Sequence, residues 1–161
     1  MEIELRERQE EHVRIYFEKV QSETVNRFLP LSSRTLEDAV TEYEKTLLPN
    51  ATSFGRVIYA DGEYIGDVWC YALGEEDPDA MLSFCVFEPL LWGRGIMTEA
   101  VSLFLDEITD RFFLKVIGAF AYADNVASHR VLLKNGFVLR ERFIEDGVLS
   151  HYYELKTNEK K

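Results

Sequence analysis

The stretch LLWGRGIMTEA, residues 90–100, places two glycines and an arginine between a tryptophan and a run of helical character. The residues before it, AMLSFCVF (80–87), are almost entirely apolar, which is typical of a strand buried on both faces. The stretch therefore predicts a turn from the end of a central strand into a helix. The first turn of a helix offers about four unpaired N–H groups at the positive end of the helix dipole. A phosphate group is a natural ligand for such a turn.

The glycines alone leave two interpretations open. Glycine allows close approach of a phosphate to the backbone, but a lone Gly-x-Gly is more often a structural turn. The nucleotide-triphosphate loop G-x-x-x-x-G-K-[ST] is absent from the chain. The dinucleotide fingerprint is also incomplete, because Thr98 stands where its third glycine belongs. A turn without a ligand and a cradle for another phosphate compound both remain possible.

Outward from this stretch, hydrophobic periodicity and turn signals predict alternating helices and strands. Two Asp-Gly pairs, at 61–62 and 146–147, indicate hairpins. Thr35, Asn125 and Ser22 have the character of helix N-caps. The predicted elements are a strand at 2–8, helices at 9–20, 22–30 and 35–47, strands at 53–60, 63–73 and 80–87, a helix at 96–108, a strand at 116–123, a helix at 125–137 and strands at 137–145 and 148–155.

The order of these elements indicates the fold class. A strand–helix–strand crossover at 80–122 places two strands parallel in one sheet, and the hairpins add antiparallel strands. The expected architecture is a mixed α/β (α+β) sheet with helices on both faces. A chain of 161 residues fits one domain over residues 1–161.

Composition excludes several function classes. The formal net charge of −11 disfavours nucleic-acid binding, which needs a basic face, and suits a cationic partner such as an amine. No run of roughly 18 apolar residues predicts a membrane span, and the charged N-terminus lacks a secretory core, so the cytoplasm is expected. Cys70 and Cys85 lie in apolar strands without a CxxC pair or a histidine cluster. They are expected to be buried reduced thiols, with no metal site.

A second pattern follows about thirty residues after the glycines. Asn125, Ser128 and the pair Gly136-Phe137 flank the helix at 125–137. Together with Trp92-Gly93-Arg94-Gly95 and the following Thr-Glu-Ala, this pattern resembles the GNAT superfamily of acyl-CoA-dependent N-acyltransferases. Within it the chain is most similar to the ribosomal-protein N-acetyltransferase (RimJ/RimL-like) branch. The resemblance implies a seven-stranded, mostly antiparallel sheet with a parallel central pair.

The resemblance also implies an activity and a set of site residues. Acetyl-CoA is the expected co-substrate, and its acetyl group passes directly to a primary amine in a ternary complex. A backbone N–H near Val86 or Phe87 is expected to polarise the thioester carbonyl. Asn125 is expected to bind the pantetheine arm, and Ser128 to donate a proton to the departing thiolate. The expected pyrophosphate ligands are the backbone N–H groups of Gly93, Arg94, Gly95, Ile96 and Met97, with the hydroxyl of Thr98.

Two positions depart from the family pattern. Leu90 replaces the usual Gln or Arg of the phosphate motif, and Leu132 stands where many members carry a tyrosine acid. Glu88 is the best-placed general base at the end of its strand. Asp67 shares a strand face with Trp69 and Tyr71, which would suit a cation-binding wall. Both carboxylates also fit the alternative of ordinary surface groups. His129 is expected to be a surface group. The helix cations Arg130 and Lys134 are expected to be solvated, with contact to the 3′-phosphate of the nucleotide as the alternative.

Three functions are weighed on these residues. The first is an N-acetyltransferase acting on a protein N-terminus or a small amine, with a cationic acceptor. The second is a non-catalytic acyl-CoA sensor or interaction module, which the leucine at position 132 keeps open. The third, a structural domain without a ligand, requires both motifs to be coincidental and ranks last. A homodimer is allowed by the resemblance.

Overall fold

A computed structural model describes residues 1–21, 35–75 and 77–157 and contains one seven-stranded sheet. The strand order is β1-β2-β3-β4-β5-β7-β6, and every neighbouring pair is antiparallel except β4 and β5, which are parallel. The predicted mixed sheet and the central place of the strand at 80–87 are thus confirmed. The elements are β1 (Ile3–Glu7), α1 (Glu10–Lys19), α3 (Leu36–Lys45), β2 (Phe54–Ala60), β3 (Glu63–Tyr71), β4 (Ala80–Val86), the 3-10 helix η1 (Pro89–Leu91), α4 (Ile96–Phe112), β5 (Val116–Tyr122), α5 (Val126–Lys134), β6 (Val138–Glu145) and β7 (Val148–Lys156). The helix predicted at 22–30 lies outside the described residues.

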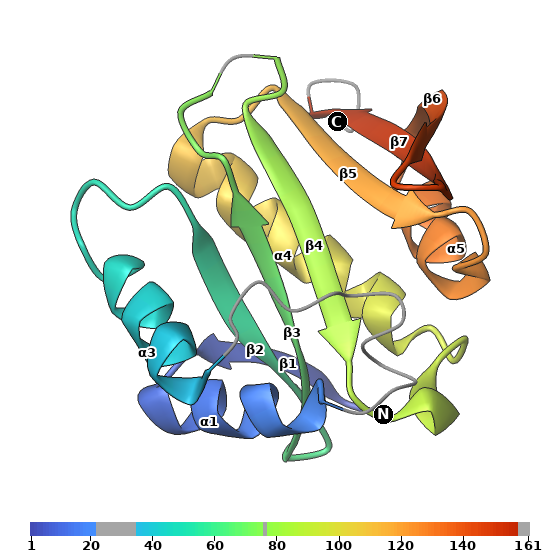
Figure 1. Ribbon diagram of the computed structural model, residues 1–161. Coiled ribbons are helices and arrows are strands. Elements are labelled where there is room, and N and C mark those ends of the chain that lie inside the picture. The colour runs from blue at the N-terminus through green and yellow to red at the C-terminus, as the bar shows by residue number, and fades with distance from the viewer. Residues whose placement is uncertain (22–34, 76, 158–161) are drawn as a thin grey trace.

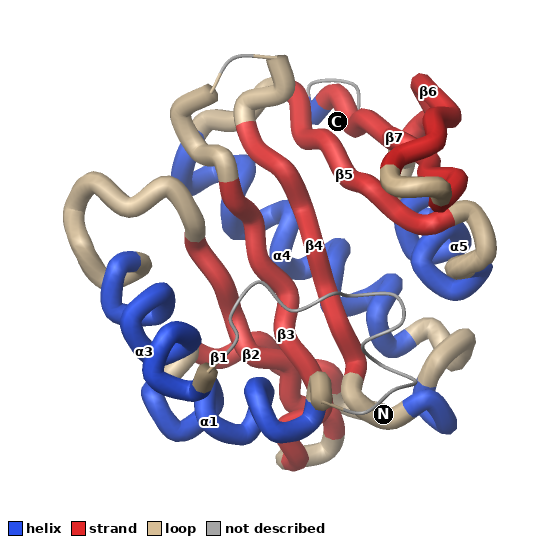
Figure 2. The backbone as a smooth tube through the Cα atoms, in the orientation of Figure 1, coloured by secondary structure: helices blue, strands red, loops and turns tan. Residues whose placement is uncertain are grey.

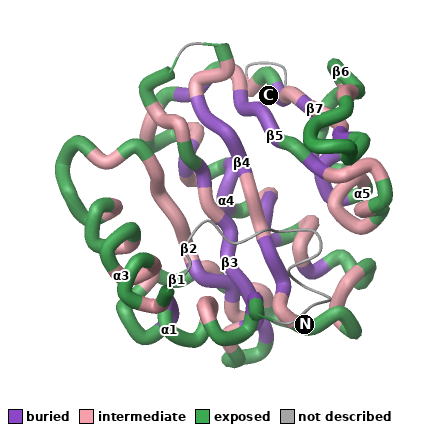
Figure 3. Tube along the Cα trace, viewed as in Figure 1, coloured by how far each residue is buried: buried purple, intermediate pink, exposed green. Residues whose placement is uncertain are grey.

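Helices cover both faces of the sheet, as the sequence predicts. In Figure 1, α4 lies behind the sheet and α1 and α3 lie in front of β1–β3, and Figure 2 shows the same layers by element type. The main core lies between α4, α5 and the sheet, where Phe104 and Leu132 are completely buried. A smaller cluster on the other face packs Tyr16 and Val20 of the α1 region against Trp69 and Cys85. Figure 3 shows the buried residues concentrated along the central strands.

Local sequence signals explain most element boundaries. The side chain of Thr35 accepts a hydrogen bond from the N–H of Asp38 at 3.1 Å and begins α3. Asp61 and Gly62 both have positive φ, at 49° and 82°, which is the backbone that a two-residue hairpin turn requires. Asp146 and Gly147 repeat this arrangement, with φ of 52° and 78°.

Tertiary packing changes two sequence expectations. The strand sequence at 116–123 has almost no polar residue, which predicts burial on both faces. Phe120 is 54% exposed, so this prediction is wrong at that position. Helical spacing predicts that Leu47 shares one apolar face of the third helix with Leu36, Val40 and Tyr43. Leu47 instead lies beyond the end of α3 and is 62% exposed. Both residues border cavities described below. None of the helices in the part of the chain that the structure describes has the length and hydropathy that a bilayer crossing requires.

The parallel pairing of β4 and β5 is short. Its register joins Ala80–Leu82 to Ile117–Ala119, although β4 continues to Val86 and β5 to Tyr122. Figure 1 shows the two strands separating beyond this pairing, with α5 beside the gap. The paired end is fastened by Asp79, whose carboxylate accepts hydrogen bonds from the N–H groups of Lys115 and Val116 at 2.8 and 2.9 Å. The separation leaves one edge of β4 without a neighbouring strand.

Replacing Asp79 by alanine should destabilise the paired end of β4 and β5. Two N–H groups at the start of β5 lose their shared acceptor, which costs about 1–3 kcal/mol in unfolding free energy. Asp79→Asn keeps an oxygen at this position and should retain more than half of that stability. Chemical denaturation of the three proteins measures the difference. Equal stability of Asp79→Ala and the wild type would show that this carboxylate does not fasten the strands.

Candidate functional site

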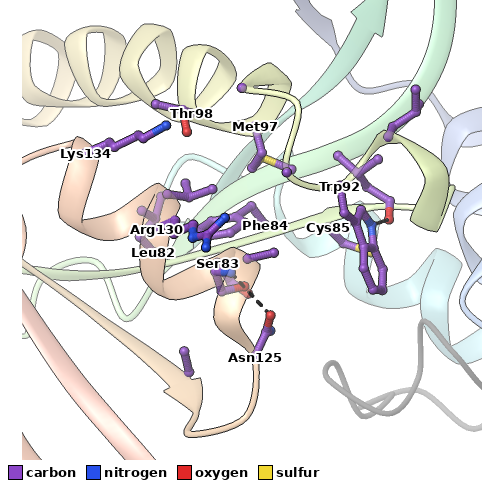
Figure 4. Close-up of a pocket in the computed structure, with 18 of the residues that line it drawn as sticks. Leu82, Ser83, Phe84, Cys85, Trp92, Met97, Thr98, Asn125, Arg130 and Lys134 are labelled. Carbon is purple, nitrogen blue, oxygen red and sulfur yellow. Dashed lines mark hydrogen bonds between the residues drawn. The ribbon is translucent and has the colours of Figure 1, made fainter.

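A cavity of about 330 Å3 lies where β4 and β5 separate, between the N-terminus of α4 and one side of α5. Figure 4 shows side chains from β4, from the loop after it and from α5 around this cavity. The structure thus brings together segments that are forty residues apart in the sequence. Seven of the predicted site residues line the cavity, namely Val86, Gly93, Gly95, Met97, Thr98, Asn125 and Ser128. Phe87, Glu88, Arg94 and Ile96 are not part of the lining.

The glycine loop has the geometry of an anion cradle. Gly93 and Gly95 have φ of 76° and 80°, and a Cβ placed on either would meet no atom within 4 Å. Positive φ explains why glycine is needed here, and the open space shows that neither glycine serves close packing. Gly95 caps α4 without a side-chain hydrogen bond. The N–H groups of the first helical turn, at Ile96, Met97 and Thr98, have no intrahelical acceptor. They are therefore available to an anionic ligand.

The edge of β4 supplies a second polar surface. The N–H of Phe87 donates to the carbonyl of Ile65 in β3 at 2.9 Å. Because backbone groups alternate along a strand, the N–H of Val86 is directed to the opposite edge, toward the gap. The prediction that Phe87 offers a free N–H is therefore wrong, and Val86 is the residue in position. The indole of Trp92 donates to the carbonyl of Val86 at 2.9 Å and holds the end of the strand beside the glycine loop.

The N-terminal half of α5 forms the opposite wall. The side chain of Asn125 accepts a hydrogen bond from the N–H of Ser128 at 3.2 Å and so caps the helix. Asn125 therefore both caps the helix and lines the cavity, and Figure 4 shows the hydrogen bond at the cavity wall. Arg130 and Lys134 also line the cavity, and Figure 4 shows them on the side of Thr98. Both side chains are exposed and also border the cavity, so the structure leaves them solvated beside a potential ligand.

A buried amide connects the two walls. Asn135 is 7% exposed, and its side chain donates to the carbonyl of Thr98 at 3.2 Å and to that of Val131 at 3.0 Å. Thr98 belongs to the first turn of α4, and Val131 to the middle of α5. The side chain of Asn135 therefore fixes the N-terminus of α4 relative to α5. Sequence reasoning missed this contact, although Asn135 lies inside the motif that it identified.

His129 is not the surface residue that the sequence predicts. Its Nδ1 lies 2.5 Å from the hydroxyl of Tyr153, and its Nε2 lies 3.0 and 3.1 Å from the carbonyl oxygens of Tyr122 and Ala123. The two carbonyls require a hydrogen on Nε2, which therefore donates to them. The imidazole thus joins α5 to β5 and β7. Its hydrogen-bonding atoms are all engaged in structural contacts.

The two predicted carboxylates, Glu88 and Asp67, are not part of the cavity lining. Glu88 is exposed, and its carboxylate accepts from the N–H of Leu90 at 3.4 Å at the start of η1. Asp67 is 1% exposed, and it pairs with Arg8 and accepts from the hydroxyl of Tyr64. Burial raises the pKa of the Asp67 carboxyl, against the opposing effect of Arg8. Neither the interpretation of Asp67 as a surface carboxylate nor that of a freely accessible cation wall is correct.

Two further features of the cavity concern its chemistry. Cys85 lines it on β4, and burial raises the pKa of this thiol to about 12, so the thiol stays protonated at neutral pH. Leu132, expected from the resemblance at the place of a tyrosine acid, is completely buried in the main core, and its hydrocarbon side chain has no proton to donate. Among the described residues, no group of three or more histidine, cysteine or acidic side chains is placed to hold a metal ion.

The chain belongs to the GNAT acetyltransferase family: the family model described as "Acetyltransferase (GNAT) domain" matches residues 2–138. A curated relative, the uncharacterized N-acetyltransferase YoaA of Bacillus subtilis (strain 168), is 33% identical over 89 residues. This match covers 53% of the chain, and the chain spans about half the length of the relative. The family membership predicted from the two motifs is confirmed.

Solved structures share the fold at low sequence identity. Spermidine N-acetyltransferase from Vibrio cholerae, in complex with CoA and spermine, has a TM-score of 0.84 at 15% identity over 97% of this chain and 96% of that one. Aminoglycoside acetyltransferase AAC(6')-Ib with coenzyme A has 0.80 at 17% identity, covering 98% and 96%. An acetyltransferase from Salmonella typhimurium that modifies the N-terminal serine of a 50S ribosomal protein has 0.79 at 18%, covering 96% and 94%. These likenesses confirm the GNAT fold over nearly the whole chain.

Proposed function

We propose that the protein transfers an acetyl group from acetyl-CoA to a primary amine by direct attack within a ternary complex. One observation carries this proposal: an uncapped helix N-terminus with two open glycines and a free strand edge meet in one cavity. The helix N-terminus with its glycines suits a pyrophosphate. The strand edge suits an amide-containing arm that ends in a thioester. Several solved structures with the same fold contain CoA or acetyl-CoA.

Each wall of the cavity has a proposed role. The N–H groups of the glycine loop and of the first turn of α4 hold the pyrophosphate, with the Thr98 hydroxyl as a further donor. Arg94, which is exposed beside the loop, adds positive charge. Arg130 and Lys134 lie where they can pair with outer phosphate oxygens. Asn125 and the edge of β4 flank the pantetheine arm.

The reacting centre is assigned to the Val86 N–H and the Ser128 hydroxyl. The amine nitrogen attacks the thioester carbonyl carbon, the carbon–sulfur bond breaks, and the amine loses a proton. The Val86 N–H stabilises the negative charge that develops on the carbonyl oxygen. Ser128 passes a proton to the departing sulfur. The protonated thiol of Cys85 is a poor nucleophile, which supports direct transfer without an acylated enzyme.

The acceptor side is proposed at the level of chemical class. The structural neighbours are named for aminoglycosides, spermidine and a ribosomal-protein N-terminus, all of which present amines. A primary amine is a cation at neutral pH, so it must lose a proton before attack. We propose that Glu88 acts as the base through an intervening water molecule, because its carboxylate caps η1 outside the cavity.

A cytoplasmic location is also proposed, and the free thiols of Cys70 and Cys85 support it.

Replacing Gly93 by glutamate should abolish acetyl-CoA binding, because the carboxylate enters the cradle and repels the pyrophosphate. Gly62→Glu is a matched control: Gly62 also has positive φ and open space around it, but it lies in the β2–β3 turn. Both variants lose comparable stability, of about 1 kcal/mol. Isothermal titration calorimetry with acetyl-CoA separates them. Normal binding by Gly93→Glu, or no binding by the wild type at millimolar ligand, would refute the proposed cradle.

Asn135→Leu should weaken binding of CoA without weakening that of pantetheine. The variant removes the amide that positions the first turn of α4, and only CoA carries the pyrophosphate that this turn binds. A reduction of roughly tenfold in CoA affinity corresponds to about 1.4 kcal/mol. Ser150→Ala, another buried polar residue, controls for general loss of stability. Equal losses for both ligands would assign Asn135 a purely structural role.

The alternative function is an acyl-CoA sensor without turnover, and the buried Leu132 in place of a tyrosine favours it. Release of the CoA thiol from acetyl-CoA across a panel of amines distinguishes the two. An enzyme releases thiol in proportion to amine concentration. Tight acetyl-CoA binding with no amine-dependent release across peptides, polyamines and aminoglycosides would favour the sensor.

A further inference from the structure

Gly66 in β3 is buried, and the end of β4 occupies the space that a side chain there would need. A Cβ built on Gly66 would lie 2.0 Å from the carbonyl oxygen of Cys85 and 2.9 Å from the Cα of Val86. Ordinary contacts of a Cβ begin near 3.4 Å. The φ of Gly66 is not positive, so glycine is required here by the close approach of β4 and not by its own conformation.

A β-bulge lies at the same level of the sheet. The register of β3 against β2 shifts here, so that Ile65 is an extra residue in β3. A bulge bends its strand and increases the local twist. The carbonyl of Ile65 accepts the N–H of Phe87 at 2.9 Å, and Gly66 forms the last pair of the β3–β4 register with Val86. The pairing of β3 with β4 therefore ends at this bulge, beside the gap.

The crowded oxygen belongs to the same peptide group as the N–H of the proposed reacting centre. The carbonyl of Cys85 and the N–H of Val86 share a planar trans peptide bond, so the two groups point in opposite directions. The oxygen is directed to Gly66 on β3. The N–H is therefore directed away from β3, into the cavity where β4 and β5 separate. The space left by the missing side chain determines how this peptide group is oriented.

Trp92 holds Val86 from the opposite side. The indole Nε1 donates to the carbonyl of Val86 at 2.9 Å. The backbone N–H of Trp92 donates to the carbonyl of Pro89 at 3.1 Å, which fixes the indole relative to η1. Val86 is 6% exposed. Its backbone thus lies between a strand that approaches closely from one side and an indole that bonds to it from the other.

We infer that Gly66 and Trp92 are positioning residues for acetyl transfer, because together they set the place of the Val86 N–H in the cavity. The inference rests on the proposed transfer, in which this N–H stabilises the developing oxyanion. Gly66 is not part of the cavity lining, so it acts only through the peptide group that joins Cys85 to Val86. Trp92 acts through the carbonyl of Val86.

A side chain at position 66 would displace this peptide group. The atoms nearest to the added Cβ are backbone atoms of β4 and not the ends of flexible side chains, so the strand itself must move. An oxyanion donor must lie about 2.7–3.1 Å from the oxygen, and a movement of about 1 Å removes most of its effect. The phosphate cradle lies on other elements, the glycine loop and α4. The expected loss is therefore in kcat and not in the affinity for acetyl-CoA.

Gly66→Ala tests the first contact. It should lower kcat about 100-fold and leave the Kd for acetyl-CoA unchanged. The rate is divided by the number of acetyl-CoA binding sites found by calorimetry, which removes any loss of folded protein. Gly118→Ala in β5 is the matched control, since its Cβ would lie 2.8 Å from the Sδ of Met81 and from the hydroxyl of Tyr152. These atoms are side-chain ends that can move, so this variant should keep its kcat per site.

Trp92→Phe tests the second contact without crowding the strand. The phenyl ring keeps an aromatic surface in the cavity but has no N–H for the carbonyl of Val86. One hydrogen bond to a neutral acceptor is lost, so kcat per site should fall roughly tenfold, less than in Gly66→Ala.

Infrared spectroscopy of bound acetyl-CoA, isotope-labelled at the carbonyl carbon, reports on the N–H directly. A hydrogen bond to the thioester carbonyl lowers its stretching frequency. The band of the wild-type complex should lie below that of free acetyl-CoA. Both Gly66→Ala and Trp92→Phe should move the band back toward the free value, and Gly118→Ala should leave it in place. A role in stability alone would not move this band.

The outcomes separate the two contacts from the proposed function. Wild-type kcat per site in Gly66→Ala, or a carbonyl band at the wild-type frequency, would overturn the role of Gly66. Loss of acetyl-CoA binding by Gly66→Ala but not by Gly118→Ala would overturn it as well, because glycine would then be needed for the fold alone. A band at the wild-type frequency in Trp92→Phe would overturn the role of Trp92. A wild-type protein that lowers the carbonyl frequency but transfers to no amine would support the positioning and refute the proposed function.

Discussion

The separation of β4 from β5 beyond Leu82 and Ala119 is the constraint on which the candidate site depends. A parallel pair that continued to Val86 would use the outward N–H groups of β4 within the sheet. Because the pairing stops, the second half of β4 presents those groups to a cavity instead. At the paired end, Asp79 fastens β4 to the start of β5. At the separated end, residues of α4 and α5 flank the unpaired edge of β4. At the gap, cavities on the two faces of the sheet share Ser83 in their linings. A continuous sheet would separate them.

Both walls of the gap are held by polar contacts from residues that do not line it. His129 joins the N-terminal half of α5 to the end of β5 and to the interior of β7, and Asn135, the C-cap of α5, joins the helix to α4. A helix held at both ends keeps Asn125 and Ser128 in fixed positions relative to the glycine loop. Pre-organisation of this kind reduces the entropy that a flexible ligand site would lose on binding. The indole of Trp92 has the same effect at the end of β4.

Much of the fold follows from local sequence signals. The Asp-Gly pairs determine two hairpins, Thr35 begins a helix, and the apolar run at 80–87 predicts the central strand. The glycine loop is predictable for a similar reason, because Gly93 and Gly95 adopt conformations that other residues avoid. The place of β7 between β5 and β6 is not predictable in this way, since it depends on pairing between distant segments.

The errors in the candidate site share a physical cause. Whether Val86 or Phe87 offers a free N–H depends on the register of β4 against β3. A shift of one residue would exchange which of the two N–H groups points to the gap. Glu88 and Asp67 are both carboxylates near the end or middle of a strand, but their neighbours in space make one a helix cap and the other a buried ion pair. Arg130 and Lys134 are directed to the cavity by the packing of α5 against the core. A second cavity, on the α1 and α3 side of the sheet, is lined by residues of β1, α1, α3, β2, β3, β4 and α4, and no local pattern predicts that these elements meet.

A crystal structure of the protein with coenzyme A tests the central claim most directly. The account predicts pyrophosphate oxygens within hydrogen-bond distance of the N–H groups of Ile96, Met97 and Thr98, and the pantetheine arm along the β4 edge, with its sulfur between Val86 and Ser128. Coenzyme A bound elsewhere, or β4 and β5 found paired through Val86 in the complex, would contradict it.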